Sequence, residues 1–429
     1  MLAIRNKIYK TTYRMAVFFK PVAMQILSPA LRQKVKRILL KRAYPLDKET
    51  IKGKMSDLTK GVNLIGYARA EMGIGESCRI AAKSMEAAGI PFGILNFTGT
   101  NSARMSDLSW SHKEIPDPLY SINLIHINAE QMMEVYAEYG NSLFQNRYNI
   151  GYWHWELPDF PDEWVENFEL MDEIWVPSNF VADSISIKSP VPVVKIPHSI
   201  KVDIPESRNR EFFDLPEAPF LFLSMYDMNS YQERKNPCAS IEAFKMAFEP
   251  NDFQVGLVLK VNSYNSNPSE LNKLYETIGN YKNIYLIKDT ISRNDVNALL
   301  SVADSFVSLH RSEGFGLGLA EAMYLGKPVI GTNWSSNTDF MSHNNSCPVD
   351  YKLVQVGQDY GPYKANQYWA EPDIEHAAYY MKRLVSEEHF YLQIGARGRE
   401  YIKKNYSPVA VGQLIEKRLE YIYKWKFGG

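Results

Sequence analysis

The chain reads LHRSEGFGLGLAEAMYLGKPVI from residue 309 to residue 330. The apolar run from Ser305 to Leu309 precedes a loop with three glycines and is typical of a buried strand. Apolar residues then recur at helical spacing from Leu319 onward, and a glycine and a proline predict the end of that helix. A second apolar run follows. The stretch therefore predicts a strand–helix–strand unit of the kind that builds parallel sheets with right-handed crossovers.

The joint between the first strand and the helix is suited to a phosphate. A helix N-terminus has free backbone N–H groups and partial positive charge, and Gly314, Gly316 and Gly318 let a ligand approach the backbone closely. Glu313 precedes the helix and Glu321 lies about one turn inside it, so both can face a ligand there. A carboxylate accepts hydrogen bonds from a diol without a metal. A phosphate flanked by two polyols describes a nucleotide sugar.

The whole string also resembles a known signature. Taken alone, the glycine loop is equally a turn with one solvent-facing and one helix-capping glutamate. Together, however, Glu313-Gly-Phe-Gly-Leu, Glu321-Ala-Met and Gly326-Lys-Pro-Val-Ile are similar to the E-x7-E motif of retaining glycosyltransferases of family 4. That family has the GT-B fold. The resemblance implies an α/β protein with two doubly wound Rossmann-like domains that face each other across a cleft.

Composition limits the class of protein. The 429 residues are enough for two domains with separate cores. Cys78, Cys238 and Cys347 are odd in number and too far apart for a metal-binding spacing, which favours a reducing compartment. No apolar run is long enough to span a bilayer, and the N-terminus lacks a secretory cleavage pattern. We therefore expect a cytoplasmic protein.

Charge is unevenly distributed along the chain. Residues 1–46 carry eleven Lys and Arg side chains and no Asp or Glu, with aromatic and aliphatic residues between them. Such a segment can lie on an anionic membrane surface, which would make the protein peripheral on the inner face of the membrane. A helix packed on the protein with solvated charges explains the same composition. Nucleic-acid binding has no accompanying motif and is not expected.

Residues 47–200 are expected to form the first, acceptor-side domain. Apolar strands alternate with helix-period segments in this range, which predicts a doubly wound α/β domain. A loop after the first strand contains Gly73-Ile-Gly75, and a helix is expected from Cys78 to Ala88. By itself the glycine pair is a weak dinucleotide-type pattern. The resemblance places it across the cleft from the donor, near the diphosphate or the acceptor.

The loop from Gly151 to Asp159 follows the fourth strand of this domain. Ligands bind outside the carboxyl ends of strands in open α/β sheets, so His154 is well placed for a cleft. A lone histidine among aromatics is as often a buried, hydrogen-bonded core residue. Many family 4 enzymes carry a cleft histidine after the corresponding strand, so the resemblance implies a catalytic role for His154. Glu156 is either a second polar contact or an anchor for the loop.

Residues 201–400 are expected to form the donor-binding domain, and residues 401–429 a helix that returns to the first domain. The segment from Lys195 to Ile200, which leads into the donor-binding domain, resembles V-x-V-I-P-N-G, but His198-Ser199 replaces the Asn-Gly pair. Family 4 enzymes often place an Arg and a Lys on the diphosphate after the next strand. Lys235 matches the Lys, and Arg234 is the substitute for the Arg. The other interpretation of this pair is a solvated turn.

A turn at residues 335–340 occupies the position of a G-G-x-x-E-like turn in family members. Its glycines are missing here, so Asn337 is either a donor contact or a structural residue. Farther on, Asp373 is expected to cap a helix.

The resemblance assigns roles to these residues. Glu321 would hold the ribose hydroxyls and Glu313 the transferred sugar. Lys235 and Arg234 would hold the diphosphate together with the loop backbone at Gly314, Phe315, Gly316, Leu317 and Gly318. The acceptor would enter on the first domain. There is no Asp-x-Asp pair of the metal-binding sort, so neither a metal nor a cofactor is expected besides the GDP- or UDP-linked donor substrate.

The expected activity is transfer of a hexose to a saccharide or lipid-linked saccharide acceptor in bacterial surface polysaccharide synthesis. The Trp-His-Trp-Glu and Arg-Lys-Asn-Pro variants of the motifs resemble mannosyltransferases of that pathway, which favours a mannose-type sugar. Two alternatives remain. One is a retaining glycoside hydrolase that uses Glu313 and Glu321 as its carboxylate pair. The other is a non-catalytic protein that binds sugar nucleotides.

Overall fold

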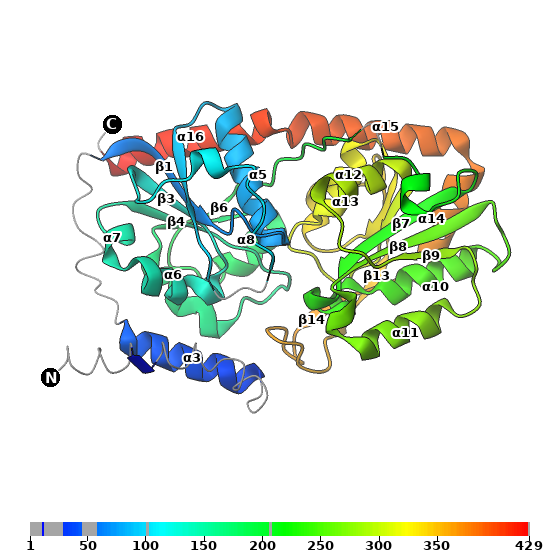
Figure 1. Cartoon of the computed structure of the whole chain (residues 1–429), viewed down its shortest axis with the longest axis horizontal. Helices are drawn as coiled ribbons and strands as arrows, with labels where there is room; N and C mark the ends of the chain where they lie inside the picture. Colours follow the sequence, from blue (N-terminus) through cyan, green and yellow to red (C-terminus); the bar gives the residue numbers. More distant parts are fainter. Residues whose placement is uncertain (1–10, 13–28, 45–57, 100–102, 206–207, 428–429) are drawn as a thin grey trace.

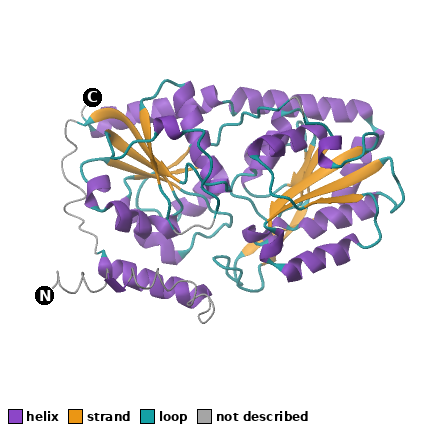
Figure 2. Cartoon of the chain, in the orientation of Figure 1, coloured by secondary structure: helices purple, strands orange, loops and turns teal. Residues whose placement is uncertain are grey.

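Two parallel sheets of six strands each organise the chain. The computed structural model describes residues 11–12, 29–44, 58–99, 103–205 and 208–427. The two sheets lie side by side, each with helices around it (Figures 1 and 2). The predicted α/β class, with two doubly wound domains, is therefore confirmed.

The first sheet has the strand order β2-β1-β3-β4-β5-β6, and all its neighbours pair in parallel. Apart from the exposed start of β1 and the edge strand β6, its strands are largely buried, which is why they appear in the sequence as near-continuous apolar runs. The strands are β1 Thr59–Gly66, β2 Phe92–Asn96, β3 Tyr120–His126, β4 Tyr148–Tyr152, β5 Glu173–Val176 and β6 Val193–Lys195. The helices are α5 Gly73–Ala87, α6 Met132–Tyr139, α7 Asn141–Phe144 and α8 Asn179–Ser186.

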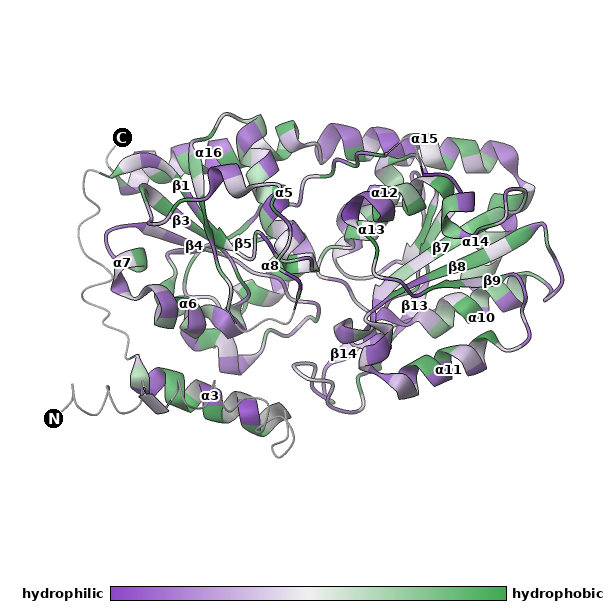
Figure 3. Cartoon of the chain, viewed as in Figure 1, coloured by the Kyte–Doolittle hydropathy of each residue, from purple (hydrophilic) through white to green (hydrophobic). Residues whose placement is uncertain are grey.

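The second sheet has the order β12-β11-β10-β7-β8-β9 and is also parallel. Its strands are β7 Phe220–Asp227, β8 Val255–Asn262, β9 Ile284–Ile287, β10 Ser305–Ser308, β11 Val329–Thr332 and β12 Cys347–Val349. Its helices are α9 Gln232–Lys235, α10 Pro237–Ala247, α11 Pro268–Ile278, α12 Arg293–Val302, α13 Leu317–Tyr324, α14 Ile374–Ser386 and α15 Glu388–Asn405. Hydrophobic residues gather on the central strands of both domains (Figure 3).

The chain crosses between the domains twice. The first crossing follows β6, and the second lies between α15 and α16 (Pro408–Lys426). The two crossings meet where the backbone N–H of Ile200 donates to the Tyr406 carbonyl over 2.6 Å. Helix α16 then packs on α5 of the first domain, and Arg418 forms a two-bond ion pair with Glu173 of β5. Helices α15 and α16 thus run along one side of both domains (Figure 1).

A hairpin of the second domain contacts the first. It consists of β13 (Tyr351–Gln355) and β14 (Tyr368–Pro372), which pair antiparallel. Val356, Tyr363 and Trp369, from the hairpin and its connecting segment, belong to the same hydrophobic cluster as first-domain side chains such as Trp155. The Gln367 amide also donates to the Asp159 carbonyl over 2.8 Å. This hairpin therefore fastens the second domain to the loop that follows β4.

Two local expectations need correction. Helix α5 begins at Gly73, not at Cys78, so Gly73 and Gly75 lie in its first turn and not in a loop. A β-carbon on Gly75 would come within 2.2 Å of the Ala70 carbonyl oxygen, so that glycine allows the helix to begin against the preceding turn. Strands β12, β13 and β14 were not expected. The predicted cap of α14 is confirmed, because the Asp373 carboxylate accepts from the His376 N–H.

The basic segment is described in part, since residues 1–10, 13–28 and 45–46 of it lie outside the described residues. Helix α3 (Pro29–Ala43) packs on α6, with Leu40 and Ala43 buried. Lys36 and Lys41 form ion pairs with Glu134 and Glu166 of the first domain. In the part of the chain that the structure describes, no helix combines the length and the hydrophobicity that a membrane span needs.

Candidate functional site

The loop between β10 and α13 carries the predicted phosphate site. Gly316 lies immediately before α13 with φ +89°, a left-handed conformation that glycine adopts without strain. Gly318 lies in the first turn, where a β-carbon would come within 2.9 Å of the Phe306 ring. Both glycines are therefore required by local geometry. No side chain caps the eight-residue helix that follows, so its first backbone N–H groups have no side-chain acceptor at the cap position.

Glu313 is held between two cations. The Lys235 ammonium donates to Glu313 Oε1 over 2.5 Å, and Arg234 Nη1 lies 3.6 Å from Oε2. The Glu313 side chain is only 12% exposed. Burial alone would raise its pKa, but Lys235 and Arg234 outweigh burial and lower the pKa of Glu313 to about 2. Glu313 is thus ionised at any physiological pH.

The two cations come from a short helix with an unusual backbone. Helix α9 lies between Tyr231 at φ +58° and Asn236 at φ +51°, which are left-handed conformations that non-glycine residues seldom adopt. Arg234 is 5% exposed and donates to the Ser312 carbonyl over 2.8 Å. The structure therefore does not place Arg234 and Lys235 on a solvated turn. It brings both to the loop between β10 and α13, where Arg234 bonds Ser312 and Lys235 bonds Glu313, and their predicted contact with a diphosphate stays a prediction.

Glu321 points to a different partner from Glu313. It is 4% exposed and bonded to Arg293, the first residue of α12. Arg293 Nε also lies 3.9 Å from Glu76 Oε1 on α5, so this guanidinium bridges the two domains. Burial raises the pKa of Glu321, and Arg293 opposes that rise. Sequence reasoning missed Arg293, because its two partners come from other helices.

Glu156 of the first domain contacts the loop between β10 and α13 and the neighbouring Arg234. Ser312 Oγ donates to its backbone carbonyl, and Arg234 Nη2 lies 3.9 Å from its Oε1. The Tyr363 hydroxyl donates to its Oε2 over 3.1 Å. Gly314 faces Glu156 as well, since a β-carbon there would lie 3.6 Å from the Glu156 side chain. Glu156 is therefore both a loop anchor and a charge beside the predicted diphosphate cations.

His154 is partly buried, and both of its ring nitrogens have neighbours. Nε2 lies 2.9 Å from Nε2 of His198, and Nδ1 lies 3.3 Å from Oδ1 of Asn128. Burial lowers the pKa of His154 to about 4, so it is neutral near pH 7. His198 in turn packs edge-on against Phe315 of the loop between β10 and α13, with 4.9 Å between the ring centroids. His154 is thus linked through one residue to the start of α13.

The side-chain amide of Asn337 is bonded within the protein through both its oxygen and its nitrogen. It is fully buried, lies 3.0 Å from His310 Nε2 through its Oδ1, and donates to the Thr332 carbonyl. Its neighbour Ser335 accepts from the Glu313 N–H over 2.9 Å. This turn therefore supports the backbone of Glu313 from behind, and a contact between Asn337 and the sugar-nucleotide donor stays a prediction. Without the glycines of the G-G-x-x-E-like turn, the sequence of residues 335–340 does not show whether the turn is buried or exposed.

Among the described residues, no group of three or more His, Cys, Asp or Glu side chains is arranged to hold a metal ion.

Comparison with known proteins bears on the second domain first. Residues 206–401 match the family model described as Glycosyl transferases group 1. A curated relative, the Trehalose synthase of Rubrobacter xylanophilus, is 24% identical over 195 residues, which cover 44% of this chain and 40% of that protein. The chain thus spans less than half the length of this relative. The match supports the resemblance at the level of group 1 for residues 206–401, whereas family 4 and its E-x7-E motif stay predictions.

Solved structures match most of the chain. Sucrose-phosphate synthase from Thermosynechococcus elongatus has a TM-score of 0.64 at 13% identity, covering 85% of this chain and 100% of its own. A glycosyltransferase from Rickettsia africae has a TM-score of 0.62 at 14% identity over 86% of this chain and 99% of its own. Anabaena HepE in complex with UDP-glucose has a TM-score of 0.61 at 12% identity, covering 85% of this chain and 100% of its own. At these identities the likeness shows the fold alone, and that fold is GT-B as predicted.

Proposed function

We propose that the protein is a retaining glycosyltransferase. It moves a hexose, with a mannose-type sugar favoured, from a GDP- or UDP-linked donor. The acceptor is a saccharide or a lipid-linked saccharide in bacterial surface polysaccharide synthesis. The observation that carries the proposal is the placement of Lys235 and Arg234 beside Glu313, directly before the N-terminus of α13. Support also comes from the group 1 match of residues 206–401.

The donor binds chiefly to the second domain. Its diphosphate lies against the free backbone N–H groups at the start of α13 and the ammonium of Lys235, because both favour negative charge. Glu321 accepts from the ribose hydroxyls and shares them with Arg293, while Glu313 accepts from the hydroxyls of the transferred sugar. As the bond from the anomeric carbon to the phosphate oxygen breaks, the same cations stabilise the charge that grows on the diphosphate.

Retention follows from attack on the face that the diphosphate leaves. The acceptor oxygen forms its new bond to the oxocarbenium-like anomeric carbon on that face, and its proton passes to the departing phosphate oxygen. His154 and Glu156 belong to the first-domain side of the site and orient the sugar or the acceptor there. This chemistry needs no carboxylate nucleophile, in keeping with a Glu313 that is already engaged by Lys235.

The deciding experiment begins with thermal-shift screening of GDP- and UDP-sugars, UDP-glucose included. The best donor is then incubated with membrane extract, and the anomeric configuration of the product is determined by NMR. Nucleotide-dependent transfer with retention is the expected result. A glycoside hydrolase would instead release sugar from a glycan without nucleotide, and a non-catalytic binding protein would bind the donor without transferring or slowly hydrolysing it.

The proposal extends to the membrane through α3. Leu31, Val35 and Ile38 are exposed along this helix, which carries basic and no acidic residues. Two of its lysines are engaged with Glu134 and Glu166, so contact with an anionic bilayer would use chiefly the exposed apolar positions. A peripheral protein held this way on the inner membrane face would meet a lipid-linked acceptor in two dimensions.

A further inference from the structure

His198 departs from the V-x-V-I-P-N-G pattern and lies next to the candidate catalytic histidine. It follows β6, 44 residues after His154 in sequence, and the two rings are 5.1 Å apart. Their Nε2 atoms are separated by 2.9 Å, which is a hydrogen-bond distance. Two neutral imidazoles can form this bond only if one nitrogen carries a hydrogen and the other is bare.

The neighbours of His154 decide which nitrogen is bare. The His154 backbone N–H donates to Asn128 Oδ1 over 3.0 Å, which identifies that atom as the amide oxygen. The same oxygen lies 3.3 Å from His154 Nδ1, so Nδ1 has to carry the ring hydrogen in order to bond it. Neutral His154 is then bare at Nε2. His198 must therefore donate its own Nε2–H to His154.

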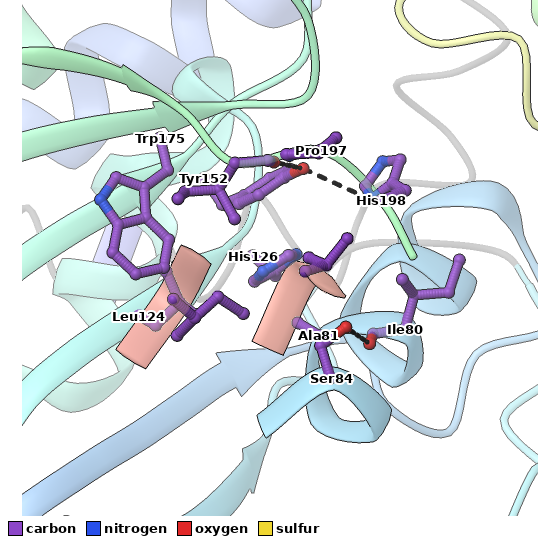
Figure 4. A pocket seen from close by; sticks show the side chains of 12 residues that line it. Ile80, Ala81, Ser84, Leu124, His126, Tyr152, Trp175, Pro197 and His198 are labelled. Carbon is purple, nitrogen blue, oxygen red and sulfur yellow. Dashed lines mark hydrogen bonds between the residues drawn. The ribbon is translucent and has the colours of Figure 1, made fainter. Parts of the chain in front are cut away.

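The surroundings of His198 keep this arrangement neutral. The titratable groups that face it are His154, His126 of β3 and Tyr152 of β4, of which Figure 4 shows the last two beside His198. The Tyr152 hydroxyl donates to the Ile196 carbonyl over 2.7 Å and lies 3.3 Å from His198 Nδ1. His198 also lines a cavity of about 10 Å³, the volume of about one water molecule. Besides His126, His198 and Tyr152, that cavity is lined by uncharged residues of α5, β5, α16 and their neighbours. No carboxylate in this lining favours an imidazolium.

We propose that His198 is a positioning residue for His154: by donating from Nε2 it fixes the ring of His154, its Nδ1–H tautomer and its neutral state. The effect of this on transfer rests on the proposed function. His198 packs at the same time against Phe315, so one side chain sets both the ring of His154 and the loop between β10 and α13. An asparagine at position 198 is too short to do both.

The tautomer is tested without any assay of transfer. Histidine is labelled with ¹⁵N in the full-length protein, and the signals of His154 and His198 are assigned by their loss in His154→Gln and His198→Gln. We expect His154 protonated at Nδ1 and bare at Nε2 at pH 7.5, and His198 protonated at Nε2. A hydrogen on His154 Nε2 would overturn the proposal, whatever the activity of the protein proves to be.

The functional arm compares two substitutions. In His198→Gln the amide nitrogen can reach the position of Nε2 and donate, whereas His198→Phe retains the ring packing and loses the donor. Because that donor stabilises neutral His154, its loss raises the pKa of His154. We expect the acid limb of kcat/KM to move upward by about one pH unit in His198→Phe. In His198→Gln it should stay at the parental pH.

The contrary outcome is equally specific. If both variants lower the melting temperature and kcat/KM alike while the acid limb stays in place, His198 only packs, and the positioning role is wrong. If the parent protein transfers no sugar at all, the proposed function fails, and the NMR result still decides the tautomer.

Discussion

Replacing Glu313 by glutamine tests the centre of the proposed site. The substitution keeps the shape of the side chain and removes the negative charge between Lys235 and Arg234. The carboxylate is 12% exposed, and its pKa falls from an ordinary 4.5 to about 2. That difference corresponds to about 3 kcal/mol of stability at neutral pH. Glu313→Gln is expected to lose stability of this order, because buried Arg234 and partly buried Lys235 are left beside a neutral amide.

The pH dependence gives the prediction its sign. A carboxylate whose pKa is lowered by folding contributes fully above its unfolded pKa and loses that contribution as the pH falls toward its folded pKa. The difference in unfolding free energy between the parent and Glu313→Gln should therefore be constant from pH 8 to about pH 5 and should shrink below about pH 4.5. Urea denaturation at a series of pH values measures it.

A matched control uses an exposed pair. Glu387 bonds Arg383 one turn away on the surface, and its side chain is 50% exposed. Glu387→Gln changes the same functional group, yet surface pairs are typically worth less than about 1 kcal/mol. We expect its denaturation midpoint to stay close to that of the parent at every pH.

The same variant has a functional consequence. Loss of a charged acceptor for the sugar hydroxyls should lower transfer by about 10- to 100-fold. Lys235 and Arg234 lose a competing carboxylate, so the free nucleoside diphosphate should bind Glu313→Gln at least as tightly as it binds the parent. A variant with parental transfer and an unchanged denaturation midpoint would refute both the electrostatic reasoning and the donor assignment.

Three further predictions concern the nucleotide, metals and the membrane. Glu321→Gln should weaken nucleoside diphosphate binding by about 10-fold in calorimetry, because the ribose loses a charged acceptor; unaltered affinity would contradict the ribose assignment. Transfer should persist in excess chelator, since Lys235, Arg234 and the start of α13 carry the leaving-group charge, and a complete loss restored by magnesium or manganese would count against this. Deletion of residues 1–46 should abolish salt-sensitive co-sedimentation with anionic vesicles while nucleotide binding persists. Equal sedimentation of the truncated protein, or none by the full chain at low salt, would favour a helix that only packs.

Much of the fold could be predicted because local pattern and tertiary role coincide. Strands such as β5 and β10 are buried on both faces, so they appear as apolar runs bounded by polar residues. Lys235 and Glu313 were each singled out by a motif, but their direct bond across 78 residues was not predicted and follows from the fold. The helix cap at Asp373 could be predicted because its bond to the His376 N–H spans only three positions in the sequence.

The remainder depends on contacts that no short pattern contains. Arg293 is an ordinary first-turn residue of α12 until the fold places it between Glu321 and Glu76. The start of α5 at Gly73 depends on the backbone of Ala70, against which Gly75 packs. Likewise, β13 and β14 alternate weakly in hydrophobicity, and Val356 and Tyr363 of their mostly exposed connecting segment are buried because they meet the first domain.

The charges at the site imply that donor binding is an exchange of partners. Glu313 is already bonded to Lys235, and Glu321 to Arg293. A diphosphate that engages Lys235 therefore replaces one anion by another, and the ribose shares a carboxylate that is already satisfied. The exchange at Lys235 contributes little net free energy, because its new bond to the diphosphate costs the bond to Glu313. Affinity for the proposed donor would then come mainly from the ribose contact with Glu321 and from the backbone N–H groups at the start of α13.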